Sequence, residues 1–337
     1  MSNFWKDKNV FITGINGFVG GNLAEELINK SANVFGLVRN SNLRTYLYHM
    51  NIDSKVEIIN GSITNKELLN GFFAENKIDI CFHLAAQVEV GVAAKYPYLT
   101  WETNVRGTYS LLESIRESCP EISAIIIASS DKAYGEYPIE KLPYKEDYPL
   151  IPKYPYDTSK ACADLISQSY ASDLFKMPIV ITRFANIYGP GQLNFSALIP
   201  DVIKCGLKNE KFIPRSNGSS KRDFLYVKDV ADLYCTIAEK IYFNKDNYRG
   251  EIFNAGTNEE KSVKEVVESI YCLLKRDNEL KNIQKRFAIN PSLEGEINFQ
   301  LMDFEKVEKY FGWRPQTLFM EGLNQTIRWF DDYLKEK

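Results

Sequence analysis

The sequence predicts an α/β protein built on a doubly wound parallel sheet, with a smaller C-terminal lobe interleaved with it. Short apolar, β-branched runs alternate with segments of helical apolar spacing up to about residue 183. Such alternation is typical of parallel sheets that are covered on both faces. The chain has 337 residues, more than one small domain needs, so a second lobe is expected.

The first part of the chain supplies the predicted sheet and its covering helices in order. The run at 122–128 is short and apolar, as in a central strand buried on both faces. We expect strands at 10–13, 34–38, 56–59, 78–84, 122–128 and 178–182, and helices at 18–30, 66–75, 100–117 and 159–175.

Gly-rich, Pro-rich and polar segments after residue 187 mark the second lobe. Near the end of the chain, 303–311 and 319–334 have the pattern of amphipathic helices. We therefore divide the chain into a sheet domain at 1–183, with returns near 224–254, and a substrate lobe formed by 184–223 and 255–337.

Composition excludes several classes of protein. Hydrophobic residues make up 45% and charged residues 25%, and the net charge is only −3, so neither disorder nor nucleic-acid binding is indicated. No run approaches the roughly 18 apolar residues of a membrane helix, and the N-terminus lacks the apolar core of a signal peptide. The six widely spaced cysteines and two histidines indicate free thiols, no metal site and a cytoplasmic location.

A glycine-rich turn joins the first predicted strand to the first predicted helix. Glycines here permit a tight turn, let backbone N–H groups approach a diphosphate and let helix and strand pack closely. Three glycines also fit a simple tight turn, but their place in the first strand–helix unit favours a dinucleotide-binding (Rossmann) domain. The expected cofactor-binding residues of this turn are Gly14, Asn16, Gly17, Phe18, Val19 and Gly20.

The second predicted strand ends at Arg39, where an NAD site usually has an acidic residue for the ribose hydroxyls. A guanidinium instead favours a 2′-phosphate. Arg39, with Asn40, Ser41 or Arg44 as possible helpers, therefore favours NADP over NAD as cofactor. A solvated surface arginine is the alternative interpretation.

Tyr156 and Lys160 lie four residues apart near the start of a predicted helix, so their side chains share one face. A lysine ammonium beside a phenol favours the phenolate, which suits acid/base work on a hydroxyl. The same spacing occurs by chance on many helices. The preceding segment, Ser129-Ser130-Asp131-Lys132, follows a buried strand, and ligands bind at the carboxyl ends of such strands.

Taken together, these motifs resemble the extended short-chain dehydrogenases that act on nucleotide sugars. The resemblance covers nearly the whole chain. It rests on the glycine turn, His83-Leu84-Ala85-Ala86-Gln87, Asn104, the Ser130 segment, Tyr156 with Lys160, the run from Arg183 to Gly191, and Arg222-Asp223-Phe224, in that order.

The resemblance implies roles for individual residues. Ser130, Tyr156 and Lys160 would form the catalytic triad, and Asn104 would support Lys160 through water. Ser62 stands where the family commonly has an aspartate facing adenine, so adenine recognition would differ. Further implied cofactor-binding residues are Ser62, Ile63, Leu84, Ala85, Ala86 and Asn104, and implied substrate-binding residues are Gln87, Ser130, Asn186, Arg215 and Arg222, with Lys221 and Arg314 as lesser candidates.

Asp131 and Lys132 distinguish activities within this family. Epimerases usually carry small or uncharged residues after the catalytic serine, whereas 4,6-dehydratases need an acid and a base for the loss of water. Asp131 and Lys132 fit these roles, with Glu136 as a lesser candidate for the base. A lysine must be neutral to act as a base. An ordinary surface ion pair is the alternative interpretation.

The resemblance implies a nucleotide-sugar 4,6-dehydratase that recycles bound NADP or NAD. The Asp-Lys pair and Arg39 together resemble the GDP-N-acetylglucosamine 4,6-dehydratase of bacterial legionaminic acid synthesis, and CDP-glucose dehydratases also have the pair. A 4-epimerase, a 4-keto reductase and a non-catalytic dinucleotide-sensing protein remain alternatives. Relatives pair through helices corresponding to 100–117 and 156–175, so a homodimer is expected.

Overall fold

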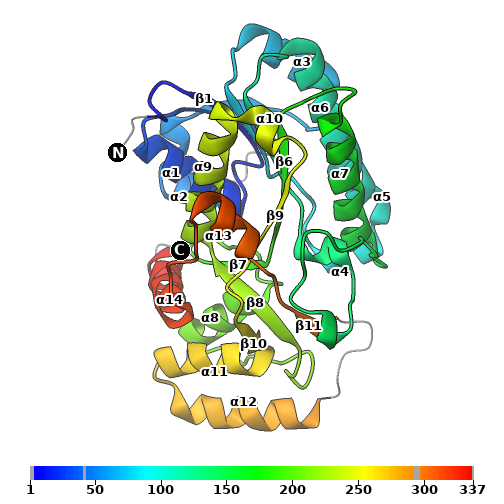
Figure 1. Ribbon diagram of the computed structural model, residues 1–337. Coiled ribbons are helices and arrows are strands. Elements are labelled where there is room, and N and C mark those ends of the chain that lie inside the picture. The colour runs from blue at the N-terminus through cyan, green and yellow to red at the C-terminus, as the bar shows by residue number, and fades with distance from the viewer. Residues whose placement is uncertain (1–3, 41–42, 291–296, 336–337) are drawn as a thin grey trace.

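The computed structural model describes residues 4–40, 43–290 and 297–335 (Figure 1). Its centre is a seven-stranded sheet in which every neighbouring pair is parallel, which confirms the predicted doubly wound fold. In spatial order the strands are β3 (Glu57–Asn60), β2 (Asn33–Val38), β1 (Asn9–Thr13), β4 (Ile80–His83), β5 (Ala124–Ala128), β6 (Ile179–Phe184) and β9 (Ile252–Ala255).

Successive residues of the central strands face opposite sides of the sheet, because side chains in a strand alternate. In β1, Val10 and Ile12 belong to one apolar core and Phe11 to the other. The first core lies under α1 (Phe18–Asn29) and α9 (Val227–Phe243). The second lies under α3 (Lys66–Glu75), α6 (Gly107–Ser118) and α7 (Pro155–Ala171), on the other side in Figure 1.

A second, smaller sheet lies beyond the carboxyl ends of the large one. Its central strand, β8 (Lys221–Tyr226), pairs with β7 (Asn186–Tyr188), β10 (Glu260–Ser262) and β11 (Phe299–Gln300). A third apolar core joins this sheet to α8 (Leu198–Lys208), α11 (Val263–Leu273), α12 (Asp277–Ile289) and α14 (Phe319–Lys335).

The chain passes between the two sheets more than once. After α8 and β8 it returns to the large sheet through α9 and β9, and only then forms β10 and the remaining helices of the small lobe. Helix α13 (Glu305–Phe311) contacts both α9 and β9. The division into domains at the residues given above stays a prediction.

The predicted elements differ from the observed ones mainly at their ends. The helix expected at 159–175 spans Pro155–Ala171, because proline suits the first turn of a helix and sets its start. The helix expected at 100–117 begins with a π-helical segment, Trp101–Arg106, before α6. The earlier start of α7 places Tyr156 and Lys160 together in its first turns.

Candidate active site

A cleft of about 800 Å³ opens at the carboxyl ends of the large sheet and is also lined by residues of β7, β8 and α8. It brings together most of the residues that the sequence singled out. Those lining it are Gly14, Asn16, Gly17, Phe18, Val19, Gly20, Arg39, Ile63, Leu84, Ala85, Ala86, Gln87, Ser130, Asp131, Lys132, Tyr156, Lys160, Asn186 and Arg222; Ser62, Asn104 and Arg215 are not among them.

The glycine turn is packed too closely for a side chain at Gly14 or Gly20. Gly14 has φ +73°, and a Cβ there would lie 2.8 Å from the backbone nitrogen of Ala85. A Cβ on Gly20 would lie 2.2 Å from the carbonyl oxygen of Gly14. The backbone of the turn is thus exposed to the cleft at the start of α1, a geometry suited to a diphosphate.

Thr13 and His83, at the ends of β1 and β4, hold the neighbouring segment that contains Leu84 and Ala85. The Thr13 hydroxyl accepts hydrogen bonds from the Leu84 and Ala85 amides, each at 3.2 Å. His83 lies between Thr13 (Nδ1, 2.8 Å) and Thr108 (Nε2, 2.9 Å). Burial, with the charge of Lys160, lowers the pKa of His83 to about 3, so this imidazole is a neutral structural support.

Asn104 lies outside the cleft wall and fixes Gln87 from behind. Its Oδ1 accepts from the Gln87 amide at 2.7 Å, and its Nδ2 donates to the Gln87 carbonyl at 3.0 Å. The same Nδ2 lies 2.8 Å from the Ser159 hydroxyl on α7. These contacts give Asn104 a bridging position between Gln87 and α7, and its predicted link to Lys160 stays a prediction.

The end of the cleft beside β2 contains Arg39, which is exposed. Asn16 Nδ2 lies 3.4 Å from the Asn40 carbonyl, which closes this corner. Ser62 bonds to the Thr64 hydroxyl at 2.8 Å instead of lining the cleft. Ser41 lies outside the described residues. Thr45, which the sequence reasoning missed, also lines this end.

Ser130, Tyr156 and Lys160 lie together where β5 ends and α7 begins. The Lys160 amine donates to the Ala128 carbonyl at the end of β5. Burial lowers the pKa of Lys160 to about 8, partly opposed by Asp164. Burial and the charge of Asp131 raise the pKa of Tyr156, and a hydrogen bond from Ser130 opposes them. A further positive charge near the phenol would therefore be needed to favour its phenolate.

Asp131 and Lys132 point into the cleft. The Asp131 side chain is buried; its Oδ1 accepts from the Ser130 hydroxyl at 2.9 Å and lies 3.6 Å from Lys132 Nζ. Its Oδ2 is buried without a hydrogen-bond partner. Glu136, the lesser candidate for a base, is exposed and does not line the cleft. An acid and an amine thus lie beside Ser130 and Tyr156.

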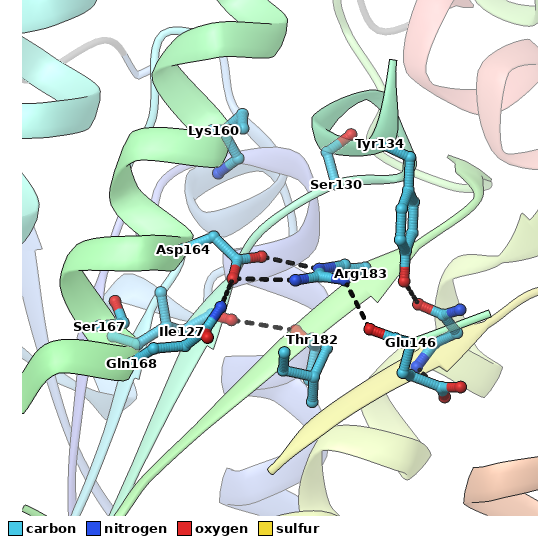
Figure 2. Close-up of polar contacts among 12 residues, drawn as sticks. Ile127, Ser130, Tyr134, Glu146, Lys160, Asp164, Ser167, Gln168, Thr182 and Arg183 are labelled. Atoms are coloured by element: carbon cyan, nitrogen blue, oxygen red, sulfur yellow. Dashed lines mark hydrogen bonds and ion pairs between the residues drawn. The ribbon is translucent and has the colours of Figure 1, made fainter. Parts of the chain in front are cut away.

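A buried ion pair connects the catalytic segments (Figure 2). The Arg183 guanidinium, at the end of β6, forks onto Asp164 with Nε–Oδ2 at 2.8 Å and Nη2–Oδ1 at 3.1 Å. Asp164 lies one turn after Lys160 on α7. Arg183 also lies 4.7 Å from the ring of Tyr134, which ends the 3-10 turn Asp131–Tyr134. The pair therefore ties the helix of Lys160 to the turn of Asp131 and Lys132.

Arg222, on β8, brings a guanidinium to the side of the cleft opposite the glycine turn's sheet. Its Nη1 donates to the Lys221 carbonyl at 2.8 Å. Arg215 is exposed away from the cleft wall. Lys221 and Arg314 form ion pairs with surface glutamates instead, Glu260 and Glu308 respectively.

Within the described residues, three further findings bear on the site. No group of three or more His, Cys, Asp or Glu side chains is arranged to hold a metal ion. All six cysteines fall in described segments and are free thiols. No described helix combines the length and apolar character needed to cross a membrane.

Fold and cleft together define an extended short-chain dehydrogenase/reductase. The family model described as GDP-mannose 4,6 dehydratase matches residues 11–326, so the chain belongs to that family. The human dTDP-D-glucose 4,6-dehydratase is 30% identical over 330 residues, which cover 96% of this chain and 90% of the relative. A putative UDP-glucose 4-epimerase of Methanocaldococcus jannaschii is 31% identical over 323 residues, covering 95% of this chain and 97% of the relative.

A solved structure extends the comparison to three dimensions. The dTDP-glucose 4,6-dehydratase of Bacillus anthracis, in complex with NAD, superposes with a TM-score of 0.82 and 27% identity. The match covers 96% of this chain and 97% of that one. The chain is therefore a member of the nucleotide-sugar 4,6-dehydratase and epimerase group, and its relatives include both activities.

Proposed function

We propose that this protein is a nucleotide-sugar 4,6-dehydratase that forms a 4-keto-6-deoxy sugar nucleotide. The main observation that supports this proposal is that Asp131 and Lys132 line the same cleft as Ser130 and Tyr156. A 4-epimerase needs only the second pair of groups, whereas loss of water also needs an acid and a base.

A nicotinamide dinucleotide fits the residues present, because the turn from Gly14 to Gly20 lines the cleft at the start of α1, where backbone N–H groups can face a diphosphate. The chemistry that a bound nicotinamide would supply is reversible hydride transfer, from sugar C4 and to C6. The positive charge of its oxidised form would also oppose the effect of burial and Asp131 on the pKa of Tyr156.

The residues of the chain supply the proton transfers. Tyr156 takes the proton of the C4 hydroxyl, and Ser130 donates a hydrogen bond to the same oxygen. Once C4 is a ketone, the C5 proton is acidic, and Lys132 removes it in its neutral form. Asp131 gives a proton to the C6 hydroxyl as water leaves, and Lys132 returns its proton to C5 when hydride is added at C6. The hydride lost from C4 is the one gained at C6, so the reaction has no net change in oxidation state.

Arg39 supports NADP as the cofactor, because a guanidinium binds a 2′-phosphate well. NAD is the alternative, in keeping with the NAD complex of the Bacillus anthracis relative. Mass spectrometry of the dinucleotide released from the purified protein distinguishes the two.

We propose GDP-N-acetylglucosamine as the substrate, on the resemblance carried by the Asp131-Lys132 pair, with Arg222 and Asn186 on its diphosphate. The test is incubation of the protein with GDP-, CDP-, UDP- and dTDP-sugars, followed by mass spectrometry. Loss of one water identifies the dehydratase and its preferred nucleotide. A product of unchanged mass would instead support the epimerase function that the Methanocaldococcus jannaschii relative suggests.

We further propose that the protein is a homodimer paired through α6 and α7. Tyr109 on α6 and Leu165 on α7 are exposed apolar side chains, and the two helices are in contact. Sedimentation equilibrium of the wild type and of Leu165→Glu tests this, since a charge in a helix-bundle interface should shift the protein to monomer.

A further inference from the structure

We propose that Gln300, on strand β11 of the small sheet, is a positioning residue that holds the amine of Lys132 for the elimination step. This inference rests on the function proposed above. Gln300 lies 168 positions from Lys132 in the chain, and its side-chain oxygen lies 3.5 Å from Lys132 Nζ.

Three oxygen atoms surround the amine of Lys132. Besides Gln300 Oε1, Asn186 Oδ1 lies at 3.4 Å and Asp131 Oδ1 at 3.6 Å. A lysine amine sits on a flexible four-carbon stem and in its charged form has three hydrogens to donate. Oxygens contributed by three different segments therefore restrict the position of this amine within the cleft.

The small sheet fixes two of these oxygens relative to each other. Asn186 on β7 is in register with Phe224 of β8, and Gln300 on β11 is in register with Arg222 of the same strand. The backbone pairing that places the two amides also carries Arg222, the guanidinium at the cleft. A substrate diphosphate held by Arg222 is thus aligned with the support of Lys132.

The burial of Gln300 argues for a polar role. Its side chain is 2% exposed, and its Nε2 is buried with no hydrogen-bond partner. An unpaired buried amide nitrogen is costly, and an apolar side chain of similar size would fill the same volume without that cost. The oxygen facing Lys132 is the feature of Gln300 that an apolar side chain could not supply.

Other charged groups also face Lys132. Asp131 lies on its own turn, Asp157 on α7 interacts with its charge, and Arg222 lines the same cleft from β8. Variants at Gln300 leave these groups in place, so a change in the pH dependence of the elimination step reports on Gln300 itself.

The test compares Gln300→Met, which removes the oxygen, with Gln300→Glu, which keeps an oxygen and adds a negative charge. Two steps are followed in the holoenzyme with the sugar nucleotide that it dehydrates. Sugar oxidation is followed by the absorbance of reduced nicotinamide in a single turnover, and elimination by exchange of the C5 hydrogen with deuterated solvent and by loss of water.

We expect sugar oxidation to stay within about twofold of wild type in Gln300→Met, while elimination slows about tenfold or more, as for a misplaced base. Elimination requires Lys132 in its neutral form and Asp131 in its protonated form, so its rate depends on pH through both groups. The limb of the profile due to Lys132 should move to lower pH in Gln300→Met and to higher pH in Gln300→Glu, because a nearby carboxylate favours the charged amine.

A purely structural role would not move the two profiles in opposite directions. The inference is overturned if both profiles coincide with wild type or shift the same way, or if Gln300→Met slows both steps equally. Gln284→Met, an exposed glutamine on α12 away from the cleft, is the matched control and should behave as wild type. If Gln300→Met does not fold, the shift of the pH profile of elimination in Gln300→Glu tests the role of Gln300 by itself.

The experiment distinguishes failure of the dehydratase proposal from failure of the role given to Gln300. A wild-type protein that removes no water from any sugar nucleotide overturns the dehydratase proposal and this inference with it. A wild type that loses water while its Gln300 variants keep the wild-type profile overturns the role of Gln300 only.

Discussion

The two halves of the cleft are built in different ways. The cofactor half is made largely of backbone, from one turn between β1 and α1 and the adjoining segment that Thr13 holds. The substrate half is made of side chains from distant segments, which meet at Lys132. A backbone site depends on close packing at a few glycines, whereas a side-chain site depends on how the two sheets are placed.

The largest effect is expected in the substrate half, for Asp131→Asn. An amide cannot give a proton to the leaving hydroxyl, so loss of water should fall by about 10²- to 10³-fold, in the range that general acids contribute. Reduced nicotinamide should accumulate, because sugar oxidation does not need this acid. Rapid-quench mass spectrometry and absorbance measure the two steps.

Glu136→Gln is the control for Asp131→Asn, since Glu136 is exposed and outside the cleft wall. It should leave both steps unchanged. Equal losses in the two variants would mean that the acid had been assigned to the wrong carboxyl group.

The next effect concerns the cofactor half, through Gly20→Ala. A Cβ here would lie 2.2 Å from the Gly14 carbonyl oxygen, so the turn must shift, at a cost of about 1–3 kcal/mol in stability. Dinucleotide affinity should fall along with it, while Gly71→Ala, with no atom within 4 Å of the new Cβ, should be stabilising by about 0.5–1 kcal/mol. Thermal unfolding and fluorescence titration measure both; equal behaviour of the two variants would contradict the close-packed turn.

A smaller effect is expected for Arg39→Ala, which removes a side chain from the cofactor half without touching its backbone. Loss of one charge-assisted hydrogen bond should weaken NADP binding about tenfold and leave NAD binding nearly unchanged. Calorimetric titration with each dinucleotide measures this preference. Parallel weakening for both would show that Arg39 does not meet the 2′-position, and Arg314→Ala, on the surface, provides the control.

The last effect, on stability alone, is a pH dependence at Asp223, which supports the small sheet. Burial raises its pKa to about 6 from 3.8, against hydrogen bonds from Thr257 and Met302. Between pH 3.8 and about 6 the folded state therefore binds more protons than the unfolded state. The stabilisation that protonated Asp223 contributes is fully present below pH 3.8 and is lost as the pH rises to about 6. The free energy of unfolding should fall by about 3 kcal/mol across that window.

Denaturant unfolding at several pH values measures the slope due to Asp223. In Asp223→Asn the slope between pH 4 and 6 should become shallower, because no proton is taken up at this position. A slope identical to that of the wild type would assign the effect to other buried carboxyls such as Asp157.

The features built from contiguous residues could be predicted from the sequence, whereas those built from distant segments could not. The large sheet was predictable because strands such as 122–128 are apolar throughout. The helix that carries Lys160 was also predicted, although its start at Pro155 lies before the expected residue 159. The glycine turn was predictable because all its residues are contiguous. Asp131, Lys132, Tyr156 and Lys160 could be proposed together because each follows a recognisable strand or opens a helix.

What the sequence could not show depends on long-range register. Gln300 belongs to a two-residue strand with no motif around it, and only its pairing with β8 brings it to Lys132. Thr13 is an unremarkable strand end until β4 lies beside it. The orphaned atoms of Gln300 and Asp131 are likewise visible only after packing.

The chain returns to its large sheet late in the sequence, and this affects folding during synthesis. Strand β9 and helix α9 are synthesised after part of the small lobe, yet β9 completes the sheet beside β6, and α9 covers one of its cores. A nascent chain ending at residue 183 would leave β6 as an open edge and that core exposed to solvent. The N-terminal half should therefore be an aggregation-prone fragment when expressed separately, and productive folding must wait for the ribosome to release most of the chain.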